Sequence, residues 1–351
     1  MTSVRLANNK DNKDLAKWDE FVLSHPDAGP YHLSAWKKSI ERAYGHKTYY
    51  FLAEDPGKNI TGIFPLALIK PPLLKASLVS LPFCDYGCML TSDGNVSSLL
   101  LHHALELSGS LNSRLEIRCK NENTLLDETG KFGLITHKSR MLLELPGSSD
   151  ELWNQFKSKL RSQVRKPMKE GLEFKMGSID MLDEFYGVFC SNMKALGSPV
   201  HSKKWIRSVM ETFSAHAHIG VVFKKDIPIA AGISLTHNDT VSIPWASTIR
   251  DYNRLSPNML LYWGFLKFAC DNGFKYFDFG RSTPGEGTYR FKEQWGAKPH
   301  PLYWYVEGAL NQDQPVLANG KIREILERAW SRLPLGIANI LGPLVRRYIS
   351  L

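Results

Sequence analysis

The sequence has no apolar run long enough to cross a bilayer, which takes about 20 consecutive residues. Its most apolar stretch, residues 60–90, is interrupted by Lys70, Lys75 and the pair Pro71–Pro72. The polar N-terminal segment MTSVRLANNKDNKDLAKW also lacks the apolar centre of a signal peptide. We therefore expect a cytoplasmic protein without a transmembrane helix.

Cysteine is scarce, and the motifs of several enzyme classes are missing. The five cysteines are odd in number and thinly spread, so we expect no disulfide framework. The tripeptide Asp278-Phe279-Gly280 occurs without the HRD loop of a kinase, and Gly285-Glu286-Gly287 lacks the third glycine of a dinucleotide fingerprint. The sequence has no GxxxxGK[ST] phosphate loop and no GxSxG elbow. It indicates no metal or redox cofactor.

Basic residues outnumber acidic ones, 44 to 35, which gives a net charge of +9. This excess favours an anionic partner: a phosphorylated substrate, RNA or an acidic membrane surface. It is concentrated in residues 157–169, which hold six basic residues and no acidic one. Apolar residues at every fourth position from Leu152 to Val164 predict a single helix with a basic stripe beside them. The stripe is either a solvated face or a phosphate-binding surface.

The length of 351 residues predicts about two domains, and a repeated pattern agrees with this. Two runs of β-forming residues, Thr48–Ala53 and Ile60–Ile69, flank a turn and predict a β-hairpin. Ile219–Phe223 and Ile229–Leu235 predict a second hairpin, which also follows helix-like segments. Either two similar α/β domains stand in tandem, or the two hairpins are unrelated.

A segment rich in Pro, Gly and Ser at 145–149 marks the predicted boundary. We assign residues 1–146 to an N-terminal domain, 147–310 to a C-terminal domain and 311–351 to an amphipathic tail. The apolar part of the tail is too short to span a bilayer and is followed by two arginines. The tail either packs on the second domain or makes a peripheral membrane contact through 333–351.

Alternating strand and helix patterns in the C-terminal half predict a βαβ-like unit. The pattern gives a strand near 239–247, a helix near 258–271 and a strand near 274–279. A connection of this kind joins parallel strands, so we expect a mixed, partly parallel sheet flanked by helices. The predicted fold class is therefore α/β (α+β).

Glycines, cations and aromatic residues are dense in DFGRSTPGEGTYRFKEQWG, residues 278–296. Such a mixture fits a binding loop, which we expect to be followed by a strand. In a regular strand Arg290 and Lys292 would share one face, and Tyr289 and Phe291 the other.

This region resembles the signature of the FemAB transferases, which carry a Gly-x-Tyr-x-Phe-Lys run, here Gly287 to Lys292. Trp18–Phe64 is similar to the opening helices and hairpin of that family, and LPFCDYG at 81–87 to its Pro-x-x-Asp segment. Residues 330–347 resemble the subgroup encoded with exosortase/PEP-CTERM and exopolysaccharide systems. The resemblance implies two tandem GNAT-like domains.

The resemblance also implies transfer of an acyl or aminoacyl group to an amine of a cell-envelope or exopolysaccharide precursor. By motif, Lys292 is the cation that stabilises the oxyanion, with Phe291 shaping the pocket. Asp85 either accepts a proton from the amine or orients it, or it only caps a turn. The remaining candidate substrate-binding residues are Tyr289, Arg290, Arg281, Arg161, Arg165 and Lys166, whose cations suit the phosphates of a donor or acceptor.

One segment departs from the GNAT pattern. GNAT enzymes bind the coenzyme A pyrophosphate with an [RQ]-x-x-G-x-[GA] loop, whereas the corresponding segment here, RDYNRLSPN at 250–258, has no glycine. The donor is therefore either an acyl-CoA bound in another way or an aminoacyl-tRNA, and the acceptor is a phosphorylated compound or a sugar nucleotide. Two rival readings are a non-catalytic module that binds RNA or an anionic glycan, and a scaffold docked through the tail.

Overall fold

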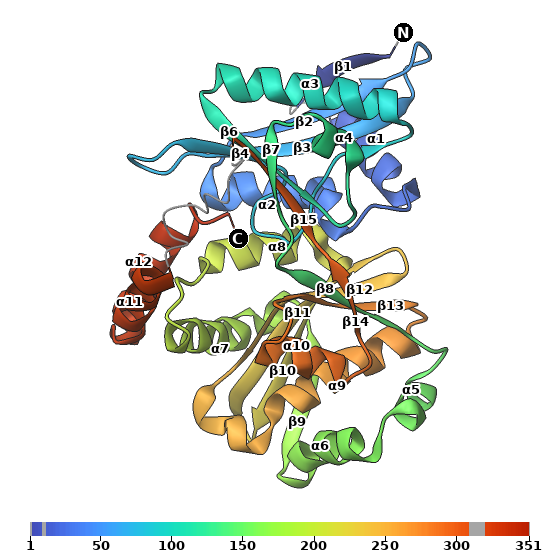
Figure 1. Ribbon diagram of the computed structural model, residues 1–351. Helices are drawn as coiled ribbons and strands as arrows, with labels where there is room; N and C mark the ends of the chain where they lie inside the picture. Colours follow the sequence, from blue (N-terminus) through green and yellow to red (C-terminus); the bar gives the residue numbers. More distant parts are fainter. Residues whose placement is uncertain (1, 9–11, 309–319, 351) are drawn as a thin grey trace. The chain divides into compact units, whose positions relative to one another are not determined.

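The computed structural model describes residues 2–8, 12–308 and 320–350 and divides into two compact units (Figure 1). The first unit comprises Met1–Ser139, Pro301–Pro315 and Tyr348–Leu351, and the second comprises Arg140–His300 and Val316–Arg347. Residues 311–319 of the predicted tail lie outside the described residues.

The first unit is built on a sheet of strand order β1-β2-β3-β4-β6-β15-β7, with β5 paired to β3. The strands are β1 (Ser3–Leu6), β2 (Thr48–Glu54), β3 (Ile60–Ile69), β4 (Ala76–Val79), β5 (Leu90–Thr91), β6 (Ser113–Cys119), β7 (Phe132–Ile135) and β15 (Tyr303–Glu307). The helices are α1 (Asn12–Ser24), α2 (Ser34–Tyr44), α3 (Gly94–Ser110), α4 (Thr124–Glu128) and the 3-10 turn η1 (Pro30–His32).

The predicted first hairpin is confirmed, because β2 and β3 pair antiparallel. Parallel strands β4 and β6 follow, and helix α3 lies between them in the chain. The Asp93 carboxylate caps α3 by accepting hydrogen bonds from the amides of Asn95 and Val96. Helix α3 packs closely on β3, where a Cβ on Gly62 would lie 2.6 Å from Cγ1 of Val96.

The second unit has a sheet of strand order β14-β8-β13-β12-β11-β10-β9. Its strands are β8 (Ser139–Glu144), β9 (Leu172–Gly177), β10 (Ala217–Lys224), β11 (Ile227–His237), β12 (Thr240–Thr248), β13 (Tyr276–Ser282) and β14 (Lys298–Pro301). Its helices are α5 (Ser149–Gln155), α6 (Ser158–Lys169), α7 (Leu182–Ala195), α8 (Lys203–Phe213), α9 (Pro257–Asp271), α10 (Gly287–Glu293), α11 (Gly320–Ser331) and α12 (Leu335–Arg346). The short 3-10 turns are η2 (Ile179–Met181), η3 (Ser214–His216) and η4 (Arg250–Leu255).

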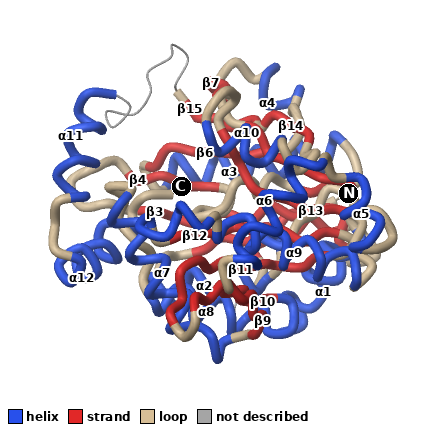
Figure 2. Tube along the Cα trace, turned by 90° about the horizontal axis from the view of Figure 1, so that it is seen from below, coloured by secondary structure: helices blue, strands red, loops and turns tan. Residues whose placement is uncertain are grey.

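Helix α9 packs on one face of the second sheet, and α7 and α8 lie across the sheet from it (Figures 1 and 2). The contact of α9 is close because the strands carry glycines there. A Cβ on Gly220 would lie 2.7 Å from the ring of Phe265 in α9. The predicted hairpin of β10 and β11 and the predicted parallel pair of β12 and β13 are both confirmed.

Each unit thus contains an antiparallel hairpin and a parallel strand pair joined through a helix. The units differ from the domains assigned from the sequence at several places. Residues 140–146, assigned to the N-terminal domain, lie in the second unit, and so do helices α11 and α12 of the predicted tail. Strand β15, residues 303–307, pairs with β6 and β7 of the first sheet, although the sequence assigned residues up to 310 to the C-terminal domain. A long-range return of this kind leaves no local signal in the sequence.

Cys88 and Cys119 form one disulfide within the first unit, which is less than the framework that the cysteine count made unexpected. One further expectation was wrong. The single helix predicted around the basic residues is two helices, α5 and α6, because Phe156 and Lys157 adopt extended backbone angles. The Phe156 ring instead packs in the core against Trp263 and Trp295.

Candidate active site

The parallel strands β12 and β13 stop pairing before their carboxyl ends, which leaves an open strand pair there. Their ladder joins Thr240–Ser242 to Tyr276–Asp278, yet β12 continues to Thr248 and β13 to Ser282. Ligands of α/β sheets bind at the carboxyl ends of parallel strands. The carboxyl end of this strand pair is therefore the candidate site.

An irregularity in β12 shapes the same region. The register between β11 and β12 shifts at Ile233/Leu235, so that two residues of β12, Ile243 and Pro244, stand opposite one residue of β11. This is the count of a β-bulge, and bulges often re-aim side chains next to active sites. Beyond the bulge, the Trp245 ring lies 6.5 Å from that of Trp205.

Two polar groups occur beside the open strand end. Asn192 of α7 donates a hydrogen bond from Nδ2 to Oγ of Ser247, at 3.1 Å. The His201 ring lies 6.3 Å from Trp245, and its burial lowers the pKa of His201 well below the usual value. His201 is therefore a neutral imidazole at neutral pH.

The segment with the Phe-Lys pair is a helix, α10, and the predicted strand over these residues is wrong. Its alternation of aromatic and basic residues imitates the period of a strand, but the two cations do not share one face. Arg290 is exposed and Lys292 is buried, with 7% of its surface accessible. The strand-based arrangement of Tyr289 and Phe291 is overturned with it.

Lys292 is held against the end of β13. Its Nζ donates hydrogen bonds to the main-chain oxygens of Gly280, at 3.0 Å, and Arg281, at 2.8 Å. Gly280 has a φ of +71°, a conformation that favours glycine. The sequence-predicted cation therefore lies at the carboxyl end of the open strand pair.

A buried ion pair supports Gly280 from its other side. The Asp278 carboxylate accepts a hydrogen bond from the Gly280 amide at 2.8 Å and another from Nε of Arg140 at 2.6 Å. Arg140 lies in the neighbouring strand β8. In the sequence, Asp278 stands out only within the tripeptide Asp278-Phe279-Gly280, and no local signal points to Arg140, because pairing across strands is a long-range feature.

Aromatic contacts attach α10 to α9 and β13. The Phe291 ring lies 5.1 Å from Tyr262 of α9, which stacks on Phe279 of β13 at 5.4 Å. Burial raises the pKa of Tyr262, so its hydroxyl stays protonated at neutral pH. Tyr289 and Phe291 both pack against the hydrophobic core of the second unit. Trp295 belongs to this core, and its ring lies 6.3 Å from that of Phe291.

The other candidate residues of this segment lie near α10. Arg290 donates hydrogen bonds from Nε and Nη2 to the Gly285 oxygen, at 3.3 and 2.9 Å, and so braces the loop before the helix. Arg281 is half-buried, and its main-chain oxygen accepts one of the Lys292 bonds.

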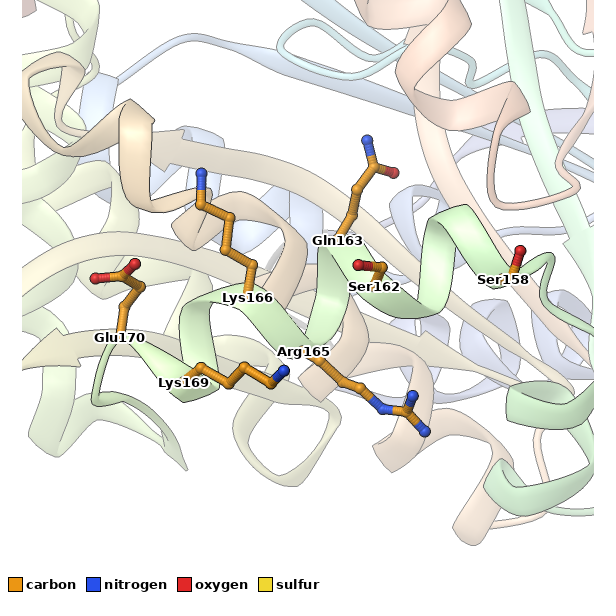
Figure 3. A pocket seen from close by; sticks show the side chains of 7 residues that line it. All are labelled: Ser158, Ser162, Gln163, Arg165, Lys166, Lys169 and Glu170. Carbon is orange, nitrogen blue, oxygen red and sulfur yellow. The ribbon is translucent and has the colours of Figure 1, made fainter.

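Helix α6 carries the remaining predicted cations beside a shallow hollow of about 390 Å³ (Figure 3). Lys166 and Gln163 extend from one side of the helix, and Arg165 and Lys169 from another. Arg165 lies over the Trp153 ring at 5.2 Å, and Arg161 is half-buried. The lining residues are Ser158, Ser162, Gln163, Arg165, Lys166, Lys169 and Glu170.

Lys166 connects this basic helix to the turn that precedes α9. Its Nζ donates a 2.6 Å hydrogen bond to the Arg254 main-chain oxygen in η4. The turn ends at Ser256, which has a φ of +56°. In the first turn of α9, Pro257 has no N–H and the Met259 amide donates to the Ser256 oxygen, so few amides remain for a phosphate.

Asp85 belongs to the first unit. It is half-buried, and its main-chain oxygen accepts a hydrogen bond from Nε1 of Trp304 at 3.0 Å. Two residues close by, Leu81 and Phe83, have positive φ angles of 63° and 68°. Such strain in bulky residues is found at functional sites, and the roles predicted for Asp85 stay predictions.

Within the described ranges, no group of three or more His, Cys, Asp or Glu residues is arranged to hold a metal ion. In the same part of the chain, no helix has the length and apolarity that crossing a membrane requires.

Residues 154–293 match the acetyltransferase (GNAT) domain. No curated protein matches the chain at a significant level. Among solved structures, FemX is 15% identical with a TM-score of 0.65, covering 89% of this chain and 98% of FemX. The C-terminal domain of a putative lysylphosphatidylglycerol synthetase from Agrobacterium fabrum is 13% identical with a TM-score of 0.58, covering 85% and 93%. A tandem GNAT protein from the clavulanic acid biosynthesis pathway is 10% identical with a TM-score of 0.55, covering 90% and 100%.

At these identities the structural likeness concerns the fold. The chain has a mixed α/β fold like that of tandem GNAT proteins and FemX, which confirms the predicted fold class. The match over 154–293 contains both α6 and the Phe291–Lys292 pair.

Proposed function

We propose that the protein transfers an acyl or aminoacyl group from an activated donor to an amine of a cell-envelope or exopolysaccharide precursor. The observation that carries this proposal is the buried ammonium of Lys292 at the carboxyl end of the open strand pair. A cation fixed in a low-dielectric site stabilises developing negative charge without reorganising during the reaction.

In the proposed reaction the amine nitrogen attacks the donor carbonyl. Negative charge then builds on the carbonyl oxygen, where the Lys292 ammonium opposes it. The C–N bond forms, the C–O bond of an ester or the C–S bond of a thioester breaks, and the leaving group departs with the bonding electrons. The amine loses one proton, for which Asp85 is the proposed acceptor or orienting group.

For the donor, we favour an aminoacyl-tRNA over coenzyme A bound in the usual way. The turn before α9 has no glycine, and the first turn of α9 offers few amides to a pyrophosphate. Among the cations of α6, Lys166 reaches this turn through its hydrogen bond to the Arg254 oxygen. A basic helix of this kind suits the backbone of an RNA.

A donor titration tests this choice. The protein is titrated calorimetrically with acetyl-CoA, with longer acyl-CoAs, and with charged and uncharged tRNA at one stated salt concentration. We expect saturable binding that prefers charged tRNA. Saturable binding of an acyl-CoA alone would overturn the donor assignment and leave acyl transfer standing. Binding of RNA without any transfer to an amine would favour the rival reading, a non-catalytic module.

A further inference from the structure

Helix α12 contacts the rest of the second unit through its smallest residues. Ala338 and Gly342 are buried, and a Cβ on Gly342 would lie 2.9 Å from the backbone nitrogen of Val200. Residues four positions apart share a helix face. The stripe of Ala338 and Gly342 therefore sets the side of α12 that meets the segment between α7 and α8 (Figure 1).

Four of the large aliphatic side chains of α12 point the other way. At about 100° per residue, the opposite arc carries Ile337, Ile340, Leu341 and Leu344. All four are exposed, Ile340 by 71% and Leu344 by 58%. We call these four residues the outer face. A surface helix normally buries its larger apolar side chains and exposes polar ones, so the orientation of α12 leaves its outer face for a partner.

The charged residues of α12 and of the turn before it are all basic. Residues 332–347 contain Arg332, Arg346 and Arg347 and no acidic residue, whereas Arg328, in α11, pairs with Glu324. Arg332 is exposed in the turn before α12, and Arg346 and Arg347 follow at the end of the helix. An aliphatic face between basic residues complements a surface that is apolar beneath and anionic above.

The same charges argue against a second copy of this chain as the partner. Two such faces placed together would bring Arg332 and Arg347 of both copies, four arginines in all, to one contact with no carboxylate from residues 332–347. The length of α12 is also informative, because its 12 residues reach about 18 Å. A bilayer core is about 30 Å thick, so α12 is suited to lie in the interface plane.

We propose that α12 and the turn before it dock on a bilayer that contains anionic phospholipid. The outer face inserts at the boundary between headgroups and acyl chains, and Arg332 lies at the level of the phosphates. Docking does not depend on the proposed transfer reaction, since none of these residues is placed in the candidate active site.

Vesicle flotation of the full-length protein tests the docking. The vesicles contain phosphatidylcholine alone, or phosphatidylcholine and phosphatidylglycerol in equal parts. We expect the wild type to float with the anionic vesicles and much less with the neutral ones. Ile340→Ser combined with Leu344→Ser should lower the vesicle partition coefficient at least about tenfold, because several aliphatic groups no longer enter the bilayer. Arg332→Gln should weaken binding to anionic vesicles only.

The matched control is Leu73→Ser combined with Leu74→Ser, which alters two exposed leucines of the first unit. Its flotation should equal that of the wild type, and thermal melts should show all variants folded. The proposal is overturned if the wild type stays unbound, or if the α12 variant floats as the wild type does. A wild-type dimer by light scattering that the α12 variant dissociates, without vesicle binding, would assign the outer face to a second copy.

Discussion

The Nζ atom of Lys292 lies 2.8 Å from the main-chain oxygen of Arg281 and donates a hydrogen bond to it. A second bond, to the Gly280 oxygen, fixes the same ammonium at the end of β13. One side chain from α10 therefore both holds the turn after β13 and brings a positive charge to the open strand pair. The structural role of Lys292 and its proposed role at the oxyanion have to be separated experimentally.

The Arg140–Asp278 pair should matter for stability. Asp278→Ala leaves the nearly buried Arg140 guanidinium without its carboxylate, which should lower the free energy of unfolding by about 3–5 kcal/mol. Urea unfolding measures the change. Lys275→Gln is the control, since it breaks the exposed pair with Asp239 and should have little effect. If both substitutions lowered the free energy of unfolding equally, the burial of the Arg140–Asp278 pair would add nothing to stability.

Replacing glycine by alanine should change the stability of the protein in opposite directions at two mid-helix positions. A Cβ on Gly264 of α9 would lie 2.5 Å from the Phe174 ring, so Gly264→Ala should cost about 1–3 kcal/mol of stability. At Gly187 of α7, which is exposed, a Cβ meets nothing within 4 Å. Gly187→Ala should stabilise the protein by up to about 1 kcal/mol. Thermal melts of the two variants measure both shifts, and a Gly264→Ala protein that melts no lower than the wild type would contradict the packing of α9.

The first unit should lose stability in acid through a network centred on Arg5. Hydrogen bonds from its guanidinium hold the pKa of Asp14 and of Glu54 below their usual values. Carboxyls with a lowered folded-state pKa stabilise the protein above their unfolded-state pKa of about 4, and this contribution is lost as the pH falls through the folded-state values.

We expect Arg5→Gln to remove that part of the pH dependence. Urea unfolding of wild type and variant between about pH 6 and about pH 3 measures the difference in stability, which should shrink at the acid end. Other titrating groups cancel in the difference. A difference in the free energy of unfolding between wild type and variant that stays constant over this pH range would contradict the network.

If α6 binds the backbone of an RNA donor, each contact between α6 and a phosphate should contribute to the salt dependence of tRNA binding. Arg165→Gln should weaken tRNA binding and lower the slope of log K against log salt by about 1. Lys131→Gln removes an exposed cation of the first unit and serves as the control. Slopes that are equal in wild type and Arg165→Gln would exclude Arg165 as a phosphate contact.

The sequence predicts the elements whose signals are local. The two hairpins and the parallel pair around α9 follow from runs of β-forming residues, turns and helical periodicity. It does not predict β15, which pairs with strands more than 160 residues earlier in the chain. At α10, the alternation of Tyr289, Arg290, Phe291 and Lys292 imitates a strand, whereas the backbone forms a helix whose Phe291 packs on Tyr262.

The sequence also predicts only part of the candidate site, namely the residues that belong to a local motif. Lys292 and Phe291 are candidates because of a family resemblance, and the structure brings Lys292 to a strand end that periodicity locates only roughly. The support of Gly280 by Asp278 and Arg140 was missed, because it depends on the neighbouring strand β8. The bulge before Trp245 was missed for a similar reason, since register is a property of two strands together.

The central claim is tested most directly by single-turnover transfer from a labelled charged tRNA to an amine acceptor, with wild type and Lys292→Ala compared at equal donor saturation. We predict that the variant keeps a cooperative melt and transfers about 10²–10³-fold more slowly, because the oxyanion loses its cation. Lys298→Ala, an exposed lysine just beyond α10, should transfer at the wild-type rate. A folded Lys292→Ala protein with undiminished transfer would contradict the account.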